Sequence, residues 1–330
     1  MGNANIYIVG TGSYLPATIV TNGEVSDTTG LSPEEIEKVT GIKERRRAAQ
    51  DEATSDLATK AALAALDSAG IEAQDVDFIV LATTSPDMPF PSTACIVQKN
   101  INAAKAAAFD INASCSGFLY ALNIAEMFLN NGQGKTALVL ASEIKSRFVN
   151  PKDRETAILF GDGAGAVVLK SSNNATHKGI LKTKLYAEGK NWSWIHLPAG
   201  GSRMPANYTT VNDGLHFMGM DGSKVYRIAI RTLERMVVDI TKECSFTLND
   251  IDLFIFHQAN QRIVKQVIKR LGITEEKVPQ SLVYYGNTSS ASIPITLDQV
   301  VRERGIKEGS LVLMASFGGG LTWGASIVRW

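Results

Sequence analysis

Cysteine is scarce in this chain of 330 residues. The three that occur, Cys95, Cys115 and Cys244, are widely separated, and none belongs to a CxxC pair or has a histidine close by in the sequence. An odd, scattered set of this kind argues against a disulfide framework and against a zinc site. We therefore expect no metal, and we expect the reducing setting of the cytoplasm.

An excess of charge of one sign is also absent, because 33 lysines and arginines balance 33 aspartates and glutamates. This balance gives no bias toward nucleic acid or a membrane surface as a partner. No apolar run is long enough to span a bilayer, and the start, MGNANIYIVG, lacks the basic segment of a secretory signal. The sequence therefore predicts a soluble, unprocessed cytoplasmic protein.

Apolar residues make up 45% of the chain and group into strand-like and helix-like stretches. The runs 76–83 and 137–142 are too continuously apolar for strands with one wet face, which indicates a sheet covered on both sides. Strands are predicted at 6–11, 76–83, 106–111, 137–142, 166–170, 180–186, 253–256, 311–315 and 325–328, and helices at 32–41, 55–69, 118–131, 223–242, 261–271 and 292–304.

The polar stretch 171–174 separates two halves of similar plan. Each half contains a buried strand with a polar residue at its end, and each finishes with a glycine-rich turn into a strand, GDGAGAVVLK in the first and FGGGLTWGASIV in the second. We expect two alpha/beta domains, 1–174 and 175–330, whose strand ends meet at a shared centre. A phosphate-binding loop leads into a helix, so these glycines indicate close backbone packing instead.

Three further segments are expected at the surface. GTGSYLP at 10–16 reads as a loop after the first strand, and the charge run KERRR at 43–47 as an exposed basic segment. The proline-rich stretch around Met88 and Phe90 predicts an exposed apolar tip, which is typical of a contact surface.

Cys115 stands where the strand 106–111 gives way to a helix. A thiol at the first turn of a helix lies beside unpaired backbone N–H groups and the positive end of the helix dipole, both of which favour the thiolate. Such a thiolate can attack a carbonyl carbon. The alternative at this point is a small buried residue filling a strand–helix corner, since free cysteine is among the most buried residue types.

Two polar residues of the second half stand at comparable places. His257 follows the strand 253–256, and Asn287 precedes a helix in the segment YGNTSS. Taken singly, the histidine could be a structural hydrogen-bonding group and the asparagine a helix cap. Together with Cys115 they supply a thiolate and two donors for a developing oxyanion, and the glycines at 318–320 add bare backbone N–H groups.

These segments resemble those of the beta-ketoacyl-acyl-carrier-protein synthase III family, and the resemblance runs from GTGSYLP to the C-terminus. The quoted motifs are CSGF at 115–118, FGDGAG at 160–165, HQAN at 257–260, GNTS at 286–289 and FGGGLTWG at 317–324. The resemblance implies the thiolase fold, in which two similar alpha/beta halves form a five-layered core, and it implies a homodimer.

The resemblance also implies the roles of the site residues. Cys115 would take an acyl group from acyl-coenzyme A or an acyl-carrier protein, and His257 and Asn287 would hold the thioester carbonyl of malonyl-acyl-carrier protein while it loses carbon dioxide. Backbone N–H groups of Cys115 and Gly319 would stabilise the oxyanion. Phe90, reaching across the dimer, and Phe317 would shape the acyl pocket. No cofactor beyond these substrates is implied.

Contacts with the carrier follow in the same way. Arg154 matches a family contact to coenzyme A. The helix 261–271 turns an apolar face inward, which leaves its basic residues for solvent or for an acidic carrier protein. The candidate docking residues are Arg227, Arg262, Lys265, Lys269 and Arg270.

One departure from the family pattern concerns the primer. Family members carry a tryptophan and an arginine that clamp the coenzyme A adenine, and here these positions hold Glu35 and Val39. Neither side chain can stack on adenine or pair with phosphate. Three possibilities stay open: a condensing enzyme that starts fatty-acid synthesis, a specialised acyltransferase or condensing enzyme of secondary metabolism, and a non-catalytic partner subunit. The sequence does not identify the acyl primer.

Overall fold

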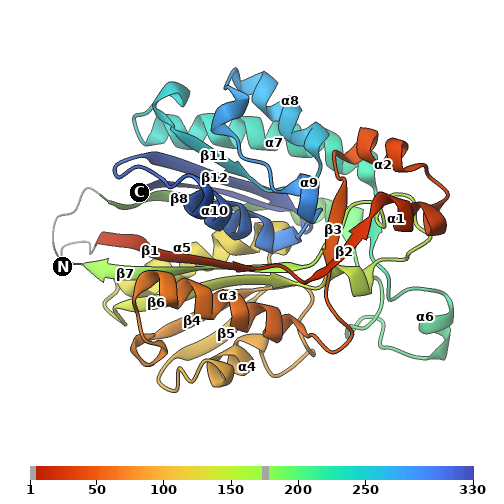
Figure 1. The fold of residues 1–330 in the computed structure, drawn as a ribbon, viewed down its shortest axis with the longest axis horizontal. Helices are drawn as coiled ribbons and strands as arrows, with labels where there is room; N and C mark the ends of the chain where they lie inside the picture. The colour runs from red at the N-terminus through yellow and green to blue at the C-terminus, as the bar shows by residue number, and fades with distance from the viewer. Residues whose placement is uncertain (1–4, 173–177) are drawn as a thin grey trace.

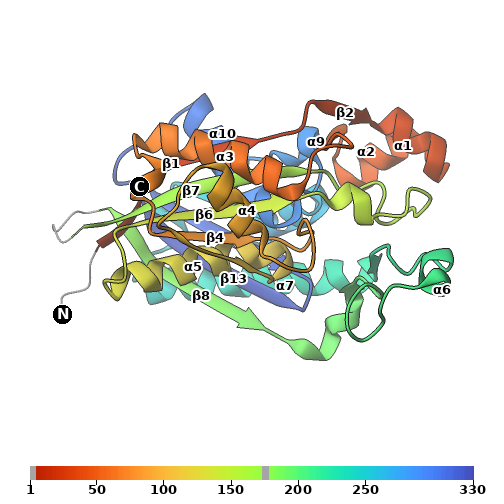
Figure 2. The ribbon, with the colours of Figure 1, turned by 90° about the horizontal axis from the view of Figure 1, so that it is seen from below.

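The computed structural model describes residues 5–172 and 178–330, which form two large sheets separated and covered by helices (Figure 1), together with small two-stranded sheets. The first predicted domain runs from Met1 to Asn174, and both of these limits lie outside the described residues. The C-terminus and the beginning of the first strand lie toward one end of the molecule. The opposite end holds helices α1 (Asn22–Thr29), α2 (Pro33–Thr40) and α6 (Tyr208–Asn212) (Figures 1 and 2).

The first sheet is built entirely from the N-terminal half. Its order is β1 (Asn5–Tyr14), β7 (Gly163–Ser172), β6 (Thr136–Glu143), β4 (Phe78–Ala82) and β5 (Ala107–Ile111). Strand β4 is parallel to both β5 and β6, whereas β7 is antiparallel to β6 and β1. Every residue of β6 is buried, as the continuous apolar run predicted.

The second sheet repeats this pattern with segments of the C-terminal half. Its order is β11 (Leu253–Phe256), β12 (Leu311–Gly318), β13 (Thr322–Arg329) and β8 (Gly179–Ala187). Strands β11 and β12 are parallel, and the remaining neighbours are antiparallel, just as β4, β6, β7 and β1 are. Within the part of the chain that the structure describes, β5 has no counterpart in the second sheet.

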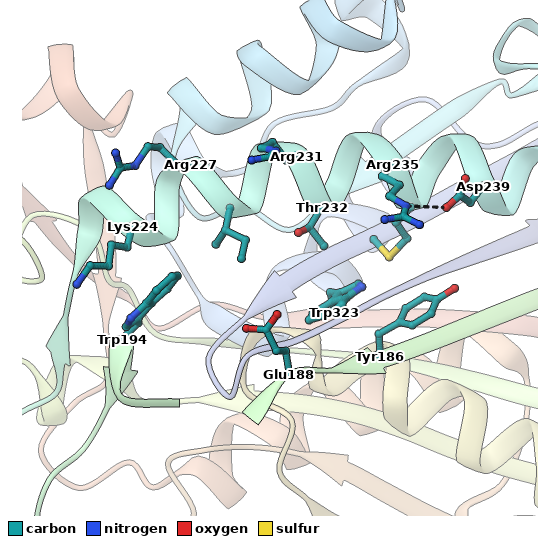
Figure 3. Close-up of a pocket in the computed structure, with 12 residues that line it drawn as sticks. Tyr186, Glu188, Trp194, Lys224, Arg227, Arg231, Thr232, Arg235, Asp239 and Trp323 are labelled. Carbon is teal, nitrogen blue, oxygen red and sulfur yellow. Dashed lines mark ion pairs between the residues drawn. The ribbon is translucent and has the colours of Figure 1, made fainter. Parts of the chain in front are cut away.

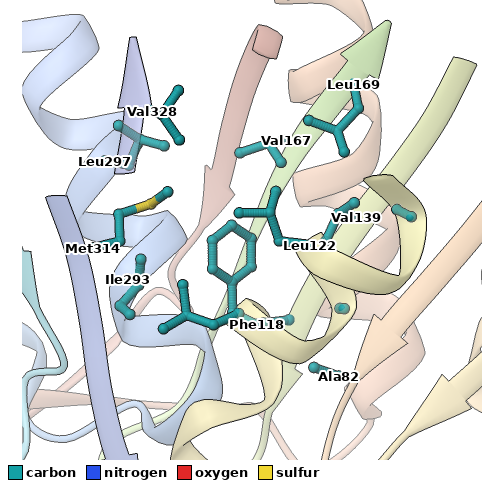
Figure 4. Packing of buried hydrophobic residues seen from close by; sticks show 14 of the residues in the cluster. Ala82, Phe118, Leu122, Val139, Val167, Leu169, Ile293, Leu297, Met314 and Val328 are labelled. Carbon is teal, nitrogen blue, oxygen red and sulfur yellow. The ribbon is translucent and has the colours of Figure 1, made fainter. Parts of the chain in front are cut away.

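Helices complete five layers. The outer helices α3 (Thr54–Ala69) and α4 (Thr93–Asn100) pack on the first sheet, and α7 (Gly222–Glu243) and α8 (Gln261–Leu271) on the second. Between the sheets lie α5 (Gly117–Asn130) and α10 (Ser292–Glu303), whose apolar side chains meet those of both sheets (Figure 4). The predicted five-layered alpha/beta arrangement is confirmed.

Several short elements carry no strong hydrophobic period and were not predicted from the sequence. They are β2 (Thr18–Thr21), α1 (Asn22–Thr29), β3 (Glu44–Arg47), β9 (Ile195–His196), α6 (Tyr208–Asn212), β10 (Gly219–Met220) and α9 (Leu282–Tyr285). The predicted helix at 32–41 is α2 (Pro33–Thr40), which begins at a capping box and ends at Gly41.

Two of the surface predictions are wrong. The stretch 10–14 continues β1, because Gly10 and Gly12 let the strand lie directly on α3: a Cβ at Gly12 would come within 2.3 Å of the Ala65 nitrogen. The run 43–47 contains β3, and Arg45 is buried, with Nη1 donating to Asn22 Oδ1 at 2.8 Å. A buried guanidinium is tolerated when such oxygens accept its hydrogens.

None of the helices among the described residues is both long and apolar enough to cross a membrane. The longest of them, α7, has 22 residues and carries charged side chains along its length.

Candidate active site

Cys115 lies at the junction that the sequence indicated. Strand β5 ends at Ile111, a single 3₁₀ turn follows at Ser114–Ser116, and α5 begins at Gly117. Ser114 has a φ of +49°, a conformation that non-glycine residues rarely adopt and that is frequent at functional sites. Cys115 lines a cavity whose other lining residues come from both halves of the chain.

Strand β12 of the other half fixes the backbone at Cys115. A Cβ at Gly318 would come within 2.7 Å of both the nitrogen and the Cβ of Cys115, so only glycine permits this approach. Two residues earlier, Ser316 Oγ donates to the Cys115 carbonyl oxygen at 2.8 Å. The glycine-rich motif of the second half therefore places the cysteine of the first.

His257 follows β11 and is buried, with its N–H donating to the Ala315 carbonyl oxygen at 2.9 Å. Its Nδ1 lies 2.7 Å from Ser292 Oγ, which also accepts from the Gln258 N–H at 3.3 Å. This arrangement lets Ser292 donate its own proton to Nδ1. In that tautomer Nε2 carries the hydrogen and is the donor of the ring.

Asn287 is oriented by both its side chain and its backbone. Its Oδ1 accepts from the Ser289 N–H at 2.9 Å, which commits the oxygen and leaves the amide NH₂ to donate. Its own N–H donates to Leu159 O at 2.8 Å, and its carbonyl oxygen accepts from the Gly161 N–H at 3.1 Å. A Cβ at Gly161 would lie 2.1 Å from Tyr285 O, so FGDGAG serves the close packing that was predicted for it.

One cavity of about 610 Å³ brings the three predicted catalytic side chains together. Cys115, His257 and Asn287 all line it, although they come from distant parts of the chain. Four further predicted residues line the same cavity, namely Phe317, Arg154, Arg227 and Arg262. Gly319 lines a smaller adjoining cavity of about 380 Å³.

The thiol of Cys115 is acidified by its neighbours. Burial raises the pKa of this thiol. The electrostatic effect of His257 and the hydrogen bonds from His257 and Ser289 lower the pKa by more than burial raises it, and Lys145 makes a smaller contribution in the same direction. The net effect lowers the pKa of Cys115 from 9.0 to about 7. A large share of the thiol is therefore ionised at neutral pH, as a nucleophile that attacks a thioester requires.

Lys145 and Glu143 form a buried ion pair beside the site, and the sequence prediction missed both. The Nζ of Lys145 lies 3.5 Å from Glu143 Oε2, and Lys145 lines both cavities. Their position at and just beyond the end of the buried strand β6 was the available signal, because polar residues at the ends of buried strands commonly face a site. Ser289 and Ser292 were likewise missed as partners of the catalytic groups.

Four other predicted residues, Phe90, Lys265, Lys269 and Arg270, do not line either of these cavities. Phe90 is 83% exposed at the tip of its loop, and Lys265 and Lys269 are exposed on α8. Arg270 is exposed as predicted, and its Nη1 lies 2.8 Å from Glu234 Oε2 of α7. Arg262 lies over the Tyr226 ring, 5.6 Å from its centroid.

The substituted clamp positions have local roles of their own. The Glu35 carboxylate accepts from the Ser32 N–H at 2.7 Å and so completes the capping box of α2. Val39 lines the catalytic cavity. Arg154 is held at its edge, where Nε donates to Thr29 O at 2.9 Å.

A broader hollow of about 880 Å³ runs along α7 (Figure 3). Lys224, Arg227, Arg231 and Arg235 follow one another down the helix on its rim, and Trp194 and Trp323 lie across from them. Arg227 lines both this hollow and the catalytic cavity. No cysteine or histidine is among the described residues that line the hollow, and the predicted reacting groups line the cavity of about 610 Å³ instead.

Comparison with known proteins agrees with this geometry. The family described as 3-oxoacyl-[acyl-carrier-protein] synthase III matches residues 109–189, and its C-terminal counterpart matches residues 241–330. A beta-ketoacyl-[acyl-carrier-protein] synthase III from Caldanaerobacter subterraneus subsp. tengcongensis is 47% identical over 323 residues, which cover 98% of this chain and 97% of that protein. The chain belongs to the beta-ketoacyl-acyl-carrier-protein synthase III family.

Solved structures of synthase III place the chain in the same group. The 3-oxoacyl-[acyl-carrier-protein] synthase III of Aquifex aeolicus superposes with a TM-score of 0.90 at 40% identity, covering 98% of this chain and all of that one. The priming beta-ketosynthase of the R1128 polyketide pathway superposes with a TM-score of 0.91 at 31% identity, over 99% and 97%. The predicted family and thiolase-like fold are confirmed, and the chain is a condensing acyltransferase.

Proposed function

We propose that this chain is a beta-ketoacyl-acyl-carrier-protein synthase III that starts fatty-acid or related synthesis, with Cys115, His257 and Asn287 as its catalytic residues. The observation that carries the proposal is their convergence on one cavity around a thiol with a pKa of about 7. These groups supply a nucleophile and two oxyanion donors, which decarboxylative condensation requires without a metal.

In the first step the Cys115 thiolate attacks the carbonyl carbon of an acyl thioester. A bond forms between Sγ and that carbon, the bond from the carbon to the carrier sulfur breaks, and the carrier leaves as a thiol after taking up a proton. Backbone N–H groups of Cys115 and Gly319 would donate to the tetrahedral oxyanion. The close approach of Gly318 to Cys115 supports this role, because it brings the two chain segments together.

In the second step His257 and Asn287 donate to the thioester carbonyl of malonyl-acyl-carrier protein. The bond between the malonyl methylene carbon and the carboxylate breaks, and carbon dioxide leaves. The electron pair of the broken bond stays with the malonyl fragment and forms an enolate, whose charge the two donors stabilise. The enolate carbon bonds to the acyl carbonyl carbon, and the bond to Sγ breaks to regenerate the thiolate. The Ser292 contact to Nδ1 supports the donor role of His257.

Acyl carrier protein is the proposed partner, and the chain is proposed to act as a homodimer in the cytoplasm. Arg227 and Arg262 line the mouth of the catalytic cavity, and Lys265 and Lys269 continue the basic surface along α8.

The exposed apolar Phe90 and the free edge of β5 in the first sheet support a dimer contact, because such features are usually covered. Light scattering would then give twice the 35.5 kDa of one chain. The division into domains 1–174 and 175–330 is part of the same proposal.

The test separates the two steps. The pure protein is incubated with a panel of acyl-coenzyme A and acyl-carrier-protein donors, and the adduct is weighed and mapped by mass spectrometry. We expect acylation of Cys115, none in Cys115→Ala, and an unchanged result in Cys244→Ala. His257→Ala and Asn287→Ala should keep the adduct and lose condensation, by about 10²- to 10³-fold for a lost oxyanion donor. Condensation that persists in Cys115→Ala would overturn the mechanism.

A specialised role in secondary metabolism is the second candidate. It is favoured by Glu35 and Val39, neither of which can hold coenzyme A as a tryptophan and an arginine would, and by the likeness to a priming beta-ketosynthase of a polyketide pathway. Adducts formed only from carrier-bound or unusual acyl groups would support it. A failure of every donor would favour a non-catalytic subunit.

A further inference from the structure

The smaller cavity, of about 380 Å³, adjoins the catalytic cavity beside Cys115. The two share Ser114, Lys145, Ile195 and Met218, and Gly319 lines the smaller one. An acyl group attached to Sγ therefore has this space next to it, and the volume lies within the ~300–1,000 Å³ range of small-molecule sites.

Lys145 brings an ammonium group to this space. Its side chain is 7% exposed, and Nζ contacts Thr84 Oγ1 and Glu143 Oε2. An ammonium has three hydrogens to donate, so these two partners leave one for a ligand. Glu143 is itself held by Ser85 Oγ at 2.6 Å and Ser290 Oγ at 2.9 Å, which fixes the pair in place.

Further polar side chains line the same cavity, namely those of Thr84, Asn112 and His196. Buried polar groups are normally paired, so a cavity with a spare ammonium hydrogen and a polar lining fits a polar ligand better than an alkyl chain.

We infer that the acyl group transferred to Cys115 carries a second oxygen, beyond that of its thioester carbonyl, and that this oxygen accepts a hydrogen bond from Lys145 in the smaller cavity. This inference rests on the proposed function and names the class of primer. Because Glu143 already balances the charge of Lys145, a neutral hydroxyl or carbonyl suffices, although a carboxylate offers the same acceptor. A plain alkyl chain would cover the ammonium without replacing its bond to water.

The test compares donors of equal chain length. Butyryl-, 3-hydroxybutyryl- and succinyl-coenzyme A each have four acyl carbons, and the initial rate of Cys115 acylation is followed by intact mass. We expect at least one oxygenated donor to react about tenfold faster than butyryl, as a hydrogen bond to a charged group allows. A preference for 3-hydroxybutyryl would identify the bound oxygen as that of a hydroxyl, and a preference for succinyl would identify it as that of a carboxylate.

Lys145→Met should abolish this preference, and Lys99→Met, at an exposed lysine of α4, should keep it. The ratio of rates within one variant is unaffected by any change in thiol reactivity. Because Lys145→Met leaves Glu143 unpaired, the double variant Lys145→Met/Glu143→Gln tests the same loss with both charges removed. Two results would overturn this inference and leave the proposed function intact. One is that butyryl reacts as fast as the oxygenated donors in the unaltered protein, and the other is that the preference survives in a folded Lys145→Met or Lys145→Met/Glu143→Gln variant. No acylation by any donor, with each acyl group offered both on coenzyme A and on acyl carrier protein, would instead overturn the proposed function.

Discussion

At the scale of single residues, the reactivity of Cys115 depends on side chains from both halves of the chain. Burial alone would make the thiol less acidic, and His257, Ser289 and Lys145 reverse that effect. The helix-terminus argument from the sequence named one source of thiolate stabilisation, but the partners that count most are brought there by folding. Local sequence could not reveal them, because each lies at the end of a different element.

The pH dependence of alkylation tests this environment. In a Cys95→Ser/Cys244→Ser background, labelling of Cys115 by iodoacetamide should rise with pH to a midpoint near 7, because the pKa is lowered and the thiolate is lost below it. His257→Ala removes the largest lowering influence and should move the midpoint upward. As a control, Cys244, whose pKa burial raises, should label slowly at pH 7 when it is the cysteine retained. A midpoint near 9 in the unaltered site would contradict the account.

Ser292→Ala tests the orientation of His257. The change leaves Nδ1 without its partner at 2.7 Å and frees the ring to adopt the other tautomer. We expect condensation to slow by up to about tenfold, the worth of one hydrogen bond, while Cys115 acylation changes less. Ser68→Ala, at an exposed serine of α3, is the matched control. Equal condensation by a folded Ser292→Ala variant would show that Ser292 does not position the ring.

At the scale of elements, the sequence predicted most long helices and buried strands, because their apolar periods reflect burial directly. It failed where tertiary contacts decide the local structure. The stretch 10–14 reads as a loop from its glycines, yet those glycines let β1 lie on α3. The run 43–47 looks solvated from its charges, yet Arg45 is buried by pairing with groups far along the chain. The segment 188–220 has no clear period, and its short elements were missed.

Gly161→Ala tests how FGDGAG supports the site. The new methyl group would lie 2.1 Å from Tyr285 O, so the segment that carries Asn287 must shift. We expect a loss of about 1–3 kcal/mol in the free energy of unfolding, measured with urea, and a larger loss in condensation than in acylation. Gly189→Ala is the control, since nothing lies within 4 Å of its Cβ position. An unaltered condensation rate in Gly161→Ala would mean that Asn287 does not depend on this contact.

At the scale of the whole molecule, the repeated sheet pattern places β11 and the turn after β5 on opposite sides of one cavity. The convergence of Cys115, His257 and Asn287 on one cavity was predictable because synthase III motifs mark the ends of these elements, and strand ends of two packed sheets meet at a centre. The buried pair of Lys145 and Glu143 carries no such motif. Around the cavity mouth, basic side chains of α7 and α8 lie together although the chain has no net charge.

Reversal of this local charge tests the proposed docking of acyl carrier protein. Arg262→Glu, and separately Arg227→Glu, should raise KM for malonyl-acyl-carrier protein several-fold, because a basic rim steers an acidic partner mainly through the encounter rate. Uptake of an acyl group from a small thioester, such as an N-acetylcysteamine derivative, should stay nearly constant. Lys99→Glu, far from the cavity on α4, controls for the change in net charge. The difference between the variants and the unaltered protein should shrink as salt screens these charges. Equal KM values at low salt for both variants and the unaltered protein would place the docking surface elsewhere.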